Sequence, residues 1–200
     1  MKKTAAVILA AGRSSRMGDF KPLLPFEGKP AIRFLVDKFI GAAIDRIIIV
    51  TGYRAEDIVK SLAGLEEISF IHNEDFETTD MFASVKLALA EARRSELDNI
   101  LVSPVDLPLI SRETVRKVLA EPGEIIIPRH RGRDGHPVKI SKVLLESLEN
   151  YRGEGGLKGA LYAHRENIVG LPVEDPFIDA DMDTKEDYDS LIRGLKKIGD

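Results

Sequence analysis

The sequence predicts an α/β fold in three layers, with a doubly wound, mostly parallel sheet covered by helices on both faces. Short runs rich in β-branched residues alternate with amphipathic stretches along the whole chain. The run Ile47–Val50 is apolar without interruption, as expected for a strand that is buried on both faces. This alternation implies right-handed crossovers between parallel strands, which gives a Rossmann-like architecture.

The first two thirds of the chain carry the clearest pattern. The expected strands are Ala5–Leu9, Arg46–Val50, Ile68–His72, Asn99–Ser103 and Glu124–Pro128. The expected helices are Pro30–Ile40, Ala55–Leu62, Met81–Arg94 and Arg112–Leu119. Pro30 is expected in a first helical turn and Ser111 at an N-cap. The third helix carries apolar residues at helical spacing that are expected in the core, namely Val85, Leu87, Ala88 and Leu89.

After Pro128 the alternation loosens. The segment Arg129–Gly135 is charged and contains glycine, which predicts a loop. The remaining elements are expected to be strands at Pro137–Ile140 and Asn167–Val173, and helices at Ser141–Tyr151, Leu157–Ala163 and Lys185–Ile198. Thr184 and Asp187 imitate a capping box ahead of the last helix. With no internal repeat and no low-complexity linker, residues 1–200 are predicted to form a single domain.

Composition excludes several functional classes. The chain has 200 residues, with 29 Lys and Arg against 33 Asp and Glu, and the net charge of −4 argues against a polybasic nucleic-acid binder. The absence of cysteine excludes disulfides, thiolate metal sites and a cysteine nucleophile. The apolar run near the N-terminus is too short to span a membrane and leads into charged residues, so it is interpreted as a buried strand. A cytoplasmic protein without nucleic-acid or membrane partners is therefore expected.

The loop after the first strand has the composition of a polyphosphate site. Between Gly12 and Lys21 it contains two glycines, two serines, two arginines and a lysine, which supply mobile backbone N–H groups and positive charge. Five residues separate Gly12 from Gly18, which excludes a Walker loop, and Ser14 stands where a dinucleotide fingerprint needs glycine. The alternative is a surface loop with solvated arginines, but the place directly after a buried strand favours phosphate.

The motif Leu9-Ala10-Ala11-Gly12-x-Ser14-x-Arg16-Met17-Gly18, followed by Lys21-x-Leu23-Leu24-Pro25, resembles the opening signature of the molybdenum cofactor cytidylyltransferase and guanylyltransferase family. These are nucleotidylyltransferases with a GT-A-like fold. The resemblance implies that the loop wraps a triphosphate and that Arg16 and Lys21 neutralise its charge. The nucleotide-binding residues that it implies are Leu9, Ala10, Ala11, Gly12, Ser14, Ser15, Arg16, Lys21, Asn73 and Ser84. The family usually has glycine where this chain has Asp80.

Later motifs extend the resemblance. Pro104–Pro108 is similar to the family's metal-binding aspartate motif, and the segment that starts at Asp181 is similar to its closing motif, with Lys185 where proline is usual. Together they imply an Mg²⁺ site held by Asp106, Asp183 and Asp181, and catalytic roles for Arg16, Lys21 and Asp106. The acceptor-binding residues implied by the remaining motifs are His136, Gly135 and Lys158. Without the resemblance, Asp106 would be interpreted as closing an Asx-turn and Asp183 as favouring a helix dipole.

The implied function is Mg²⁺-dependent transfer of a nucleoside monophosphate from a nucleoside triphosphate to the phosphate of molybdopterin, with release of pyrophosphate. Ala11 favours CTP over GTP, because the guanylyl branch usually has glycine there. Residues 1–128 would bind the nucleotide, residues 129–200 would bind the acceptor and add the terminal helix, and a molybdoenzyme would be the client. Two alternatives stay open: a sugar-phosphate or polyol-phosphate nucleotidylyltransferase, and a non-catalytic nucleotide-binding module.

Overall fold

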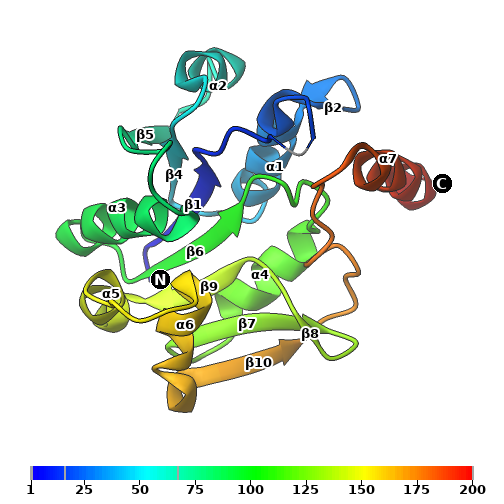
Figure 1. Cartoon of the computed structure of the whole chain (residues 1–200). Helices are drawn as coiled ribbons and strands as arrows, with labels where there is room; N and C mark the ends of the chain where they lie inside the picture. Colours follow the sequence, from blue (N-terminus) through cyan, green and yellow to red (C-terminus); the bar gives the residue numbers. More distant parts are fainter. Residues whose placement is uncertain (1, 16, 67, 200) are drawn as a thin grey trace.

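The computed structural model describes residues 2–15, 17–66 and 68–199, and within these ranges eight strands form one sheet (Figure 1). Seven of them follow the spatial order β10-β7-β9-β6-β1-β4-β5, and β8 (Arg133–Asp134) pairs with β7. The bounds of the seven are β1 Thr4–Ala10, β4 Arg46–Thr51, β5 Ile68–His72, β6 Asn99–Pro104, β7 Ile125–His130, β9 Val138–Ser141 and β10 Ile168–Pro172.

Most strand pairs are parallel. β1 lies parallel to both β4 and β6, β4 is parallel to β5, and β7 is parallel to β10. The exceptions are β9, which runs antiparallel to β6 and β7, and β8, which forms a hairpin with β7. The hairpin replaces the predicted loop Arg129–Gly135. It turns at Arg131 and Gly132, whose positive φ angles of 49° and 81° suit a tight reversal.

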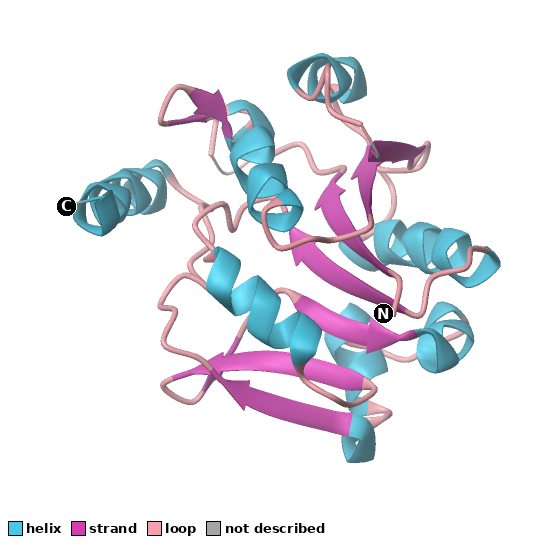
Figure 2. Cartoon of the chain, turned by 180° about the vertical axis from the view of Figure 1, so that it is seen from behind, coloured by secondary structure: helices cyan, strands magenta, loops and turns pink. Residues whose placement is uncertain are grey.

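Helices cover both faces of the sheet, which confirms the predicted three-layer, doubly wound architecture (Figures 1 and 2). One face carries α1 (Ala31–Ile40), α2 (Ala55–Ser61) and α4 (Arg112–Ala120), and the other carries α3 (Met81–Arg94), α5 (Lys142–Glu149) and α6 (Gly156–Tyr162). Alternate β1 residues enter the two apolar clusters, with Ala5, Val7 and Leu9 on one side and Ala6, Ile8 and Ala10 on the other. β1 is therefore buried throughout.

A third apolar cluster holds the C-terminal helix α7 (Lys185–Gly199) at the outer edge of the molecule. Its partners are α1 and the hairpin of β2 (Pro25–Phe26) and β3 (Lys29–Pro30), which was not predicted. The Tyr188 hydroxyl donates to the Pro25 carbonyl at 2.6 Å, and the Tyr188 and Phe26 rings meet edge to face at 5.4 Å. The start of α7 is thereby fixed next to the loop after β1.

The buried carboxylate of Asp175 fixes the segment that precedes α7. It accepts hydrogen bonds from the Ser111 and Phe177 backbone N–H groups at 2.9 and 3.0 Å and from the Thr114 hydroxyl at 2.7 Å. Ser111 is the N-cap of α4, as predicted, and accepts from the Thr114 N–H at 3.1 Å. The connection from β10 to α7 is thus tied to the start of α4.

The predicted strands and helices are all present, with ends within two residues of those expected. Besides the loop Arg129–Gly135, two details were wrong. Pro30 lies in β3 and at the N-cap of α1 instead of in the first turn, because it pairs with Pro25 in the hairpin. Leu87 is 38% exposed, since α3 turns this position away from the sheet, whereas Val85, Ala88 and Leu89 are buried. Among the described residues, no helix combines the length and apolar character needed to cross a membrane.

Candidate functional site

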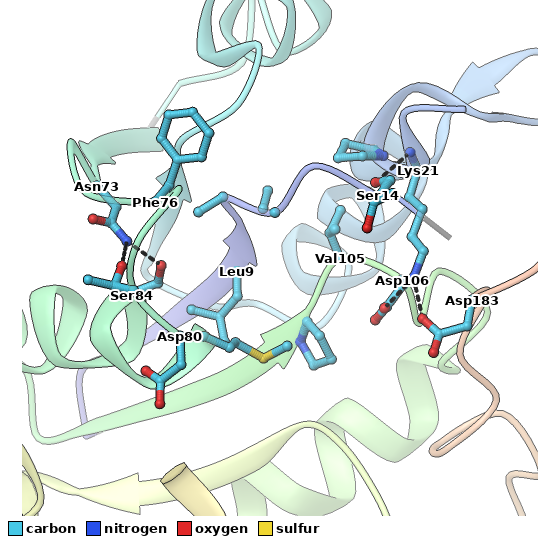
Figure 3. A pocket seen from close by; sticks show the side chains of 18 residues that line it. Leu9, Ser14, Lys21, Asn73, Phe76, Asp80, Ser84, Val105, Asp106 and Asp183 are labelled. Atoms are coloured by element: carbon cyan, nitrogen blue, oxygen red, sulfur yellow. Dashed lines mark hydrogen bonds and ion pairs between the residues drawn. The ribbon is translucent and has the colours of Figure 1, made fainter. Parts of the chain in front are cut away.

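A cavity of about 260 Å³ opens where the sheet reverses its direction of growth. The chain adds β4 and β5 on one side of β1 and then places β6 on the other side, so the loops after β1 and β6 separate at this edge. Open parallel sheets bind ligands at such switch points. Figure 3 shows the side chains that line the cavity, which come from the ends of β1 and β6, from α3 and from the segment before α7.

The cavity brings together every described residue predicted to bind nucleotide. They are Leu9, Ala10, Ala11, Gly12, Ser14, Ser15, Lys21, Asn73 and Ser84. Arg16, predicted for both nucleotide binding and catalysis, lies outside the described residues. Asp106 and Asp183 also line the cavity, so two of the three predicted metal ligands lie beside the predicted phosphate loop.

The loop after β1 presents backbone donors to this cavity. Ser14 adopts a left-handed conformation with φ of 59°, and its hydroxyl oxygen accepts a hydrogen bond from the Lys21 backbone N–H at 3.1 Å. The Met17 N–H donates to the Ser14 carbonyl at 3.0 Å, which closes a turn. No described residue accepts a hydrogen bond from the N–H groups of Gly12 or Ser15. These groups can therefore donate to oxyanions of a ligand.

The segment after β4 supports the loop from behind. The Tyr53 N–H donates to the Ala11 carbonyl at 3.1 Å. A Cβ on Gly52 would lie 2.7 Å from the Ala11 carbonyl oxygen and 2.7 Å from the Phe76 Cβ, so only glycine allows this approach. Arg13 lies over the rings of Tyr53 and Phe76 at 5.7 Å from each centroid and forms an ion pair with Glu77. The loop after β1 is thereby joined to the loop after β5.

Lys21 and two aspartates form the charged centre of the cavity (Figure 3). The Lys21 Nζ lies 3.2 Å from Asp106 Oδ2 and 2.5 Å from Asp183 Oδ1. The side chains are only 10% exposed for Lys21, 19% for Asp106 and 25% for Asp183. A backbone hydrogen bond from the Met182 N–H to the Asp106 carbonyl, at 3.2 Å, holds the two acidic segments together. Two carboxylates thus share one cation at the edge of the sheet.

The donor set of this centre suits a divalent cation with oxygen ligands. Oδ2 of Asp106 and Oδ1 of Asp183 converge on a single positive group, and Mg²⁺ commonly takes one or two carboxylates together with waters and substrate phosphates. Within the described ranges, no three His, Cys, Asp or Glu side chains are grouped to hold a metal by themselves. The two aspartates are therefore suited to a metal that arrives with phosphate ligands.

Asp181, the third predicted metal ligand, is exposed and lines neither this cavity nor the one beside it. Partial desolvation raises the pKa of its carboxyl group, and the negative charges of Asp106 and Asp183 raise it further. Asp181 thus lies within electrostatic reach of the pair and adds to the negative potential there, while its own carboxylate faces solvent.

Asn73 and Ser84, both predicted to bind nucleotide, are buried and bonded to each other. The Asn73 amide nitrogen donates to Ser84 Oγ at 3.0 Å and to Thr79 Oγ1 at 3.3 Å, while its amide oxygen accepts from the Asp75 N–H at 3.1 Å. These bonds use both amide hydrogens of Asn73. Asn73 therefore shapes the loop between β5 and α3 that borders the nucleotide cavity.

A second cavity of about 420 Å³ adjoins the first and shares Leu9, Asp80, Met81 and Pro104 with it. All three predicted acceptor-binding residues, Gly135, His136 and Lys158, line it. The rest of its wall is mostly apolar and comprises Phe82, Val85, Ile127, Val138, Leu157, Leu161 and Tyr162, besides Asp134 and Gly156. A ligand in one cavity would therefore touch a ligand in the other.

His136 is held rigidly in the wall of the second cavity. Its backbone N–H donates to the Ile178 carbonyl at 2.8 Å, and its ring Nδ1 lies 3.2 Å from the Val102 carbonyl oxygen. Because a carbonyl only accepts, Nδ1 carries the proton, and Nε2 of the neutral ring is an acceptor. Burial lowers the pKa of His136, against smaller opposing effects of the Val102 carbonyl and Asp106. At neutral pH the ring is uncharged and can accept a hydrogen bond from a ligand.

Several residues that line the two cavities were not predicted from the sequence. Phe76 and Thr79 line the nucleotide cavity, and Asp80 and Met81 line both cavities. Their position after the carboxyl end of β5 was the signal that could have found them. Lys86, in the same helix as Ser84, lines neither cavity. Its ammonium donates instead to the Tyr151 carbonyl at 2.6 Å.

Comparisons with known proteins agree with this geometry. The family model of the MobA-like NTP transferase domain matches residues 6–168. Molybdenum cofactor cytidylyltransferase of Escherichia coli (strain K12) is 30% identical over 192 residues, which are 94% of this chain and 95% of that protein. The match to the relative is thus nearly end to end.

Solved structures give the same result. Rv0371c from Mycobacterium tuberculosis H37Rv superposes with a TM-score of 0.84 at 27% identity, covering 96% of this chain and 98% of that one. Its complex with manganese has a TM-score of 0.77 at 24% identity, with coverage of 96% and 98%. A nucleotidyl transferase from Methanothermobacter thermautotroptrophicus has a TM-score of 0.84 at 26% identity, with coverage of 98% and 99%. Taken with the cavity at the switch point, these matches show that the chain belongs to the MobA-like NTP transferase family of nucleotidylyltransferases.

Proposed function

We propose that this protein transfers the nucleoside monophosphate of CTP, in preference to GTP, to the phosphate of a molybdopterin-type acceptor and releases pyrophosphate. The observation that carries the proposal is the pair of adjoining cavities. One is lined by backbone donors, Lys21 and two aspartates, and the other by apolar side chains with Lys158 and neutral His136. The name of the Escherichia coli relative supports the choice of CTP and of the acceptor.

The chemistry of this transfer is chiefly a problem of charge. An oxygen of the acceptor phosphate attacks the α-phosphorus, the bond to the β-phosphate bridging oxygen breaks, and pyrophosphate leaves with that electron pair. The attacking oxygen is already anionic, so no strong base and no covalent nucleophile is needed. Positive groups must instead bring two polyanions together and stabilise the charge that develops on the leaving group.

Residues of the nucleotide cavity can supply that stabilisation. The N–H groups of Gly12 and Ser15 and the ammonium of Lys21 would bind phosphate oxygens, and we propose the same role for Arg16. Asp106 and Asp183 would hold Mg²⁺, with Asp181 adding negative potential beside them. When bound, the ion supplies Lewis-acid stabilisation of the phosphate oxygens. The manganese complex of Rv0371c supports a divalent ion in a protein of this fold.

The second cavity favours a bulky acceptor with flat ring faces. Its aromatic and aliphatic wall includes Phe82, Leu161 and Tyr162, which would pack against ring faces. Lys158 would contact the acceptor phosphate, and Nε2 of His136 would accept from a ring N–H or hydroxyl group. A sugar phosphate would need several hydrogen-bonding partners, and the apolar wall offers few of them. Gly135 also lines this cavity, and a side chain there is excluded because a Cβ would lie 2.5 Å from the Ile178 carbonyl oxygen.

The same proposal assigns different binding roles to the two parts of the chain. Residues 1–128 would bind the nucleotide, and residues 129–200 would bind the acceptor, with Asp183 of the second part completing the metal site. The boundary falls inside β7, so the two parts share a strand of one sheet. A molybdoenzyme that receives the finished cofactor remains the expected client.

Pyrophosphate release by the purified protein tests the proposal. CTP and GTP are each supplied with Mg²⁺ and with molybdopterin, and in parallel with sugar phosphates and polyol phosphates. Release that requires molybdopterin and is faster with CTP supports the proposal. Release only with a sugar phosphate or polyol phosphate would instead establish the first alternative. Tight CTP binding by calorimetry without any release would establish a non-catalytic module.

A further inference from the structure

We propose that the Lys21 ammonium is a displaceable counter-ion that occupies the carboxylate oxygens used by the divalent cation, so that metal uptake moves Lys21 onto the substrate phosphates. The inference rests on the proposed function and adds a coupling between the two binding events. It assigns Lys21 two successive partners, first the aspartates and then the phosphate. Metal and nucleotide would consequently bind with positive cooperativity.

The contacts of Lys21 show which carboxylate oxygens its ammonium and a divalent cation would compete for. Its Nζ lies 2.5 Å from Asp183 Oδ1 and 3.2 Å from Asp106 Oδ2, and these two carboxylates are the proposed metal ligands. Figure 3 shows the ammonium between the two carboxylates. Among the described residues that line this cavity, Lys21 is the one lysine or arginine. Within the described part of the chain, its ammonium is therefore the positive group in this cavity that offsets the repulsion between two partly buried carboxylates.

A divalent ion cannot share this position with the ammonium. Both cations need the same oxygen lone pairs, and two like charges a few ångströms apart at low solvent exposure repel strongly. The Lys21 side chain is only 10% exposed, so solvent screens the repulsion weakly. A metal that binds Asp106 and Asp183 must therefore displace the ammonium.

The backbone of Lys21 determines where the displaced ammonium can go. Its N–H donates to the Ser14 hydroxyl oxygen at 3.1 Å, so the base of the side chain is fixed against the phosphate loop. The lysine stem is flexible, and its head can move while the backbone stays in place. The anionic group nearest to this anchor would be the triphosphate on the loop N–H groups. The metal site and the phosphate site are thus connected through one side chain.

Because metal binding and nucleotide binding are thermodynamically linked, each should strengthen the other. If metal binding releases Lys21 to the phosphate, nucleotide binding must favour metal binding by the same factor. Metal alone would bind weakly, because displacement of Lys21 leaves its ammonium without a buried partner. Removal of the ammonium should therefore strengthen metal binding when no nucleotide is present. A purely catalytic role of Lys21 would not produce this effect.

Calorimetric titration with Mn²⁺ alone tests the inference on the full chain. We expect Lys21→Met to bind Mn²⁺ about tenfold more tightly than the unchanged protein, a change of about 1.4 kcal/mol. Lys29→Met is the matched control, since it also removes one lysine from an aspartate, Asp37, at 2.6 Å on the exposed surface. That control should leave the Mn²⁺ affinity unchanged, which separates the local effect from the change in net charge.

Two further results complete the test. Asp183→Asn added to Lys21→Met should abolish the gain in affinity, and electron paramagnetic resonance should report the bound Mn²⁺. Circular dichroism checks the fold, and Lys21→Gln replaces Lys21→Met if the latter unfolds. Equal or weaker Mn²⁺ binding in a folded Lys21 variant overturns the inference. Because this titration needs no turnover, its result is independent of whether pyrophosphate release supports the proposed function.

Discussion

Asp106 and Asp183 lie 77 positions apart in the chain, and one backbone hydrogen bond accounts for much of their meeting. The Met182 N–H donates to the Asp106 carbonyl, and the buried Met182 side chain anchors the segment in the apolar cluster under α7. The resemblance of two short motifs predicted both aspartates as metal ligands. Lys21 was predicted as a phosphate-binding residue, but its ion pairs with both aspartates were not, because pairing between distant side chains leaves no periodic trace in the sequence.

Replacement of Asp106 tests the metal role directly. Asp106→Asn keeps the size of the side chain and removes its charge, so we expect pyrophosphate release to fall about 100- to 1000-fold. The thermal midpoint reports whether the fold persists. Asp37→Asn is the control. It removes the ion pairs of Asp37 with Lys29 and Arg33 and should retain activity. Full activity in the Asp106 variant would remove the proposed mechanism.

Asn73 illustrates a residue whose place was predicted and whose role was not. The family resemblance implied that it binds nucleotide, yet its amide group is bonded to Ser84, Thr79 and Asp75. A buried amide with these partners fixes a loop more readily than it contacts a ligand. The family resemblance identified the residue because it follows a strand that ends at the cavity. It could not predict the hydrogen bonds of the Asn73 amide group.

Asn73→Ala should therefore act through the loop. The variant leaves Ser84 Oγ and the Asp75 N–H without their present partners, which we expect to cost about 1–3 kcal/mol of unfolding free energy. Urea denaturation measures this loss, and nucleotide titration should show a raised Kd. A raised Kd for nucleotide with an unchanged free energy of unfolding would assign Asn73 to direct nucleotide contact. Lys86→Met, in α3 but outside both cavities, is the comparison variant.

At the scale of whole elements, α7 places Asp183. The predicted capping box is confirmed: the Thr184 N–H and hydroxyl donate to Asp187 Oδ2, both at 2.8 Å, and the Asp187 N–H donates to Thr184 Oγ1 at 3.2 Å. The bonds from Thr184 lower the pKa of Asp187. The hairpin under α7 was not predicted, because strands of two residues are too short to show alternation.

Removal of the cap should weaken the metal site indirectly. Thr184→Ala is expected to cost about 1 kcal/mol of stability, since an N-cap hydroxyl is lost one residue after Asp183. The Mg²⁺ concentration that gives half-maximal activity should rise, while the rate at saturating Mg²⁺ changes little. Ser190→Ala, which removes a hydroxyl bonded within α7 at Glu186, is the control. An unchanged Mg²⁺ requirement in Thr184→Ala would show that the cap does not position Asp183.

For the molecule as a whole, the periodicity of the sequence predicted the layers well. Uninterrupted apolar runs identified the central strands, and helical spacing identified the covering helices. The antiparallel direction of β9 was not predicted, because side-chain alternation is the same for a strand of either direction. The single-domain organisation and the cytoplasmic location expected from the sequence stay predictions.

Stability should depend on pH through His136. The folded protein holds this ring neutral with a lowered pKa, while in the unfolded chain the pKa is about 6.5. The unfolded state therefore binds more protons below about pH 6.5, and stability is lost as pH falls, by up to about 1.4 kcal/mol per pH unit. Urea denaturation from pH 5 to 8 should show that the free energy of unfolding of His136→Gln depends less steeply on pH.

The shared wall between the two cavities has a consequence for inhibition. Leu9, Asp80, Met81 and Pro104 border both, so the nucleotide–acceptor conjugate formed in the proposed reaction would span them as one molecule. A covalently tethered compound loses translational freedom once instead of twice, which strengthens its retention. Turnover would accordingly be limited by departure of the conjugate, and stable mimics of it would be stronger blockers than analogues of either half.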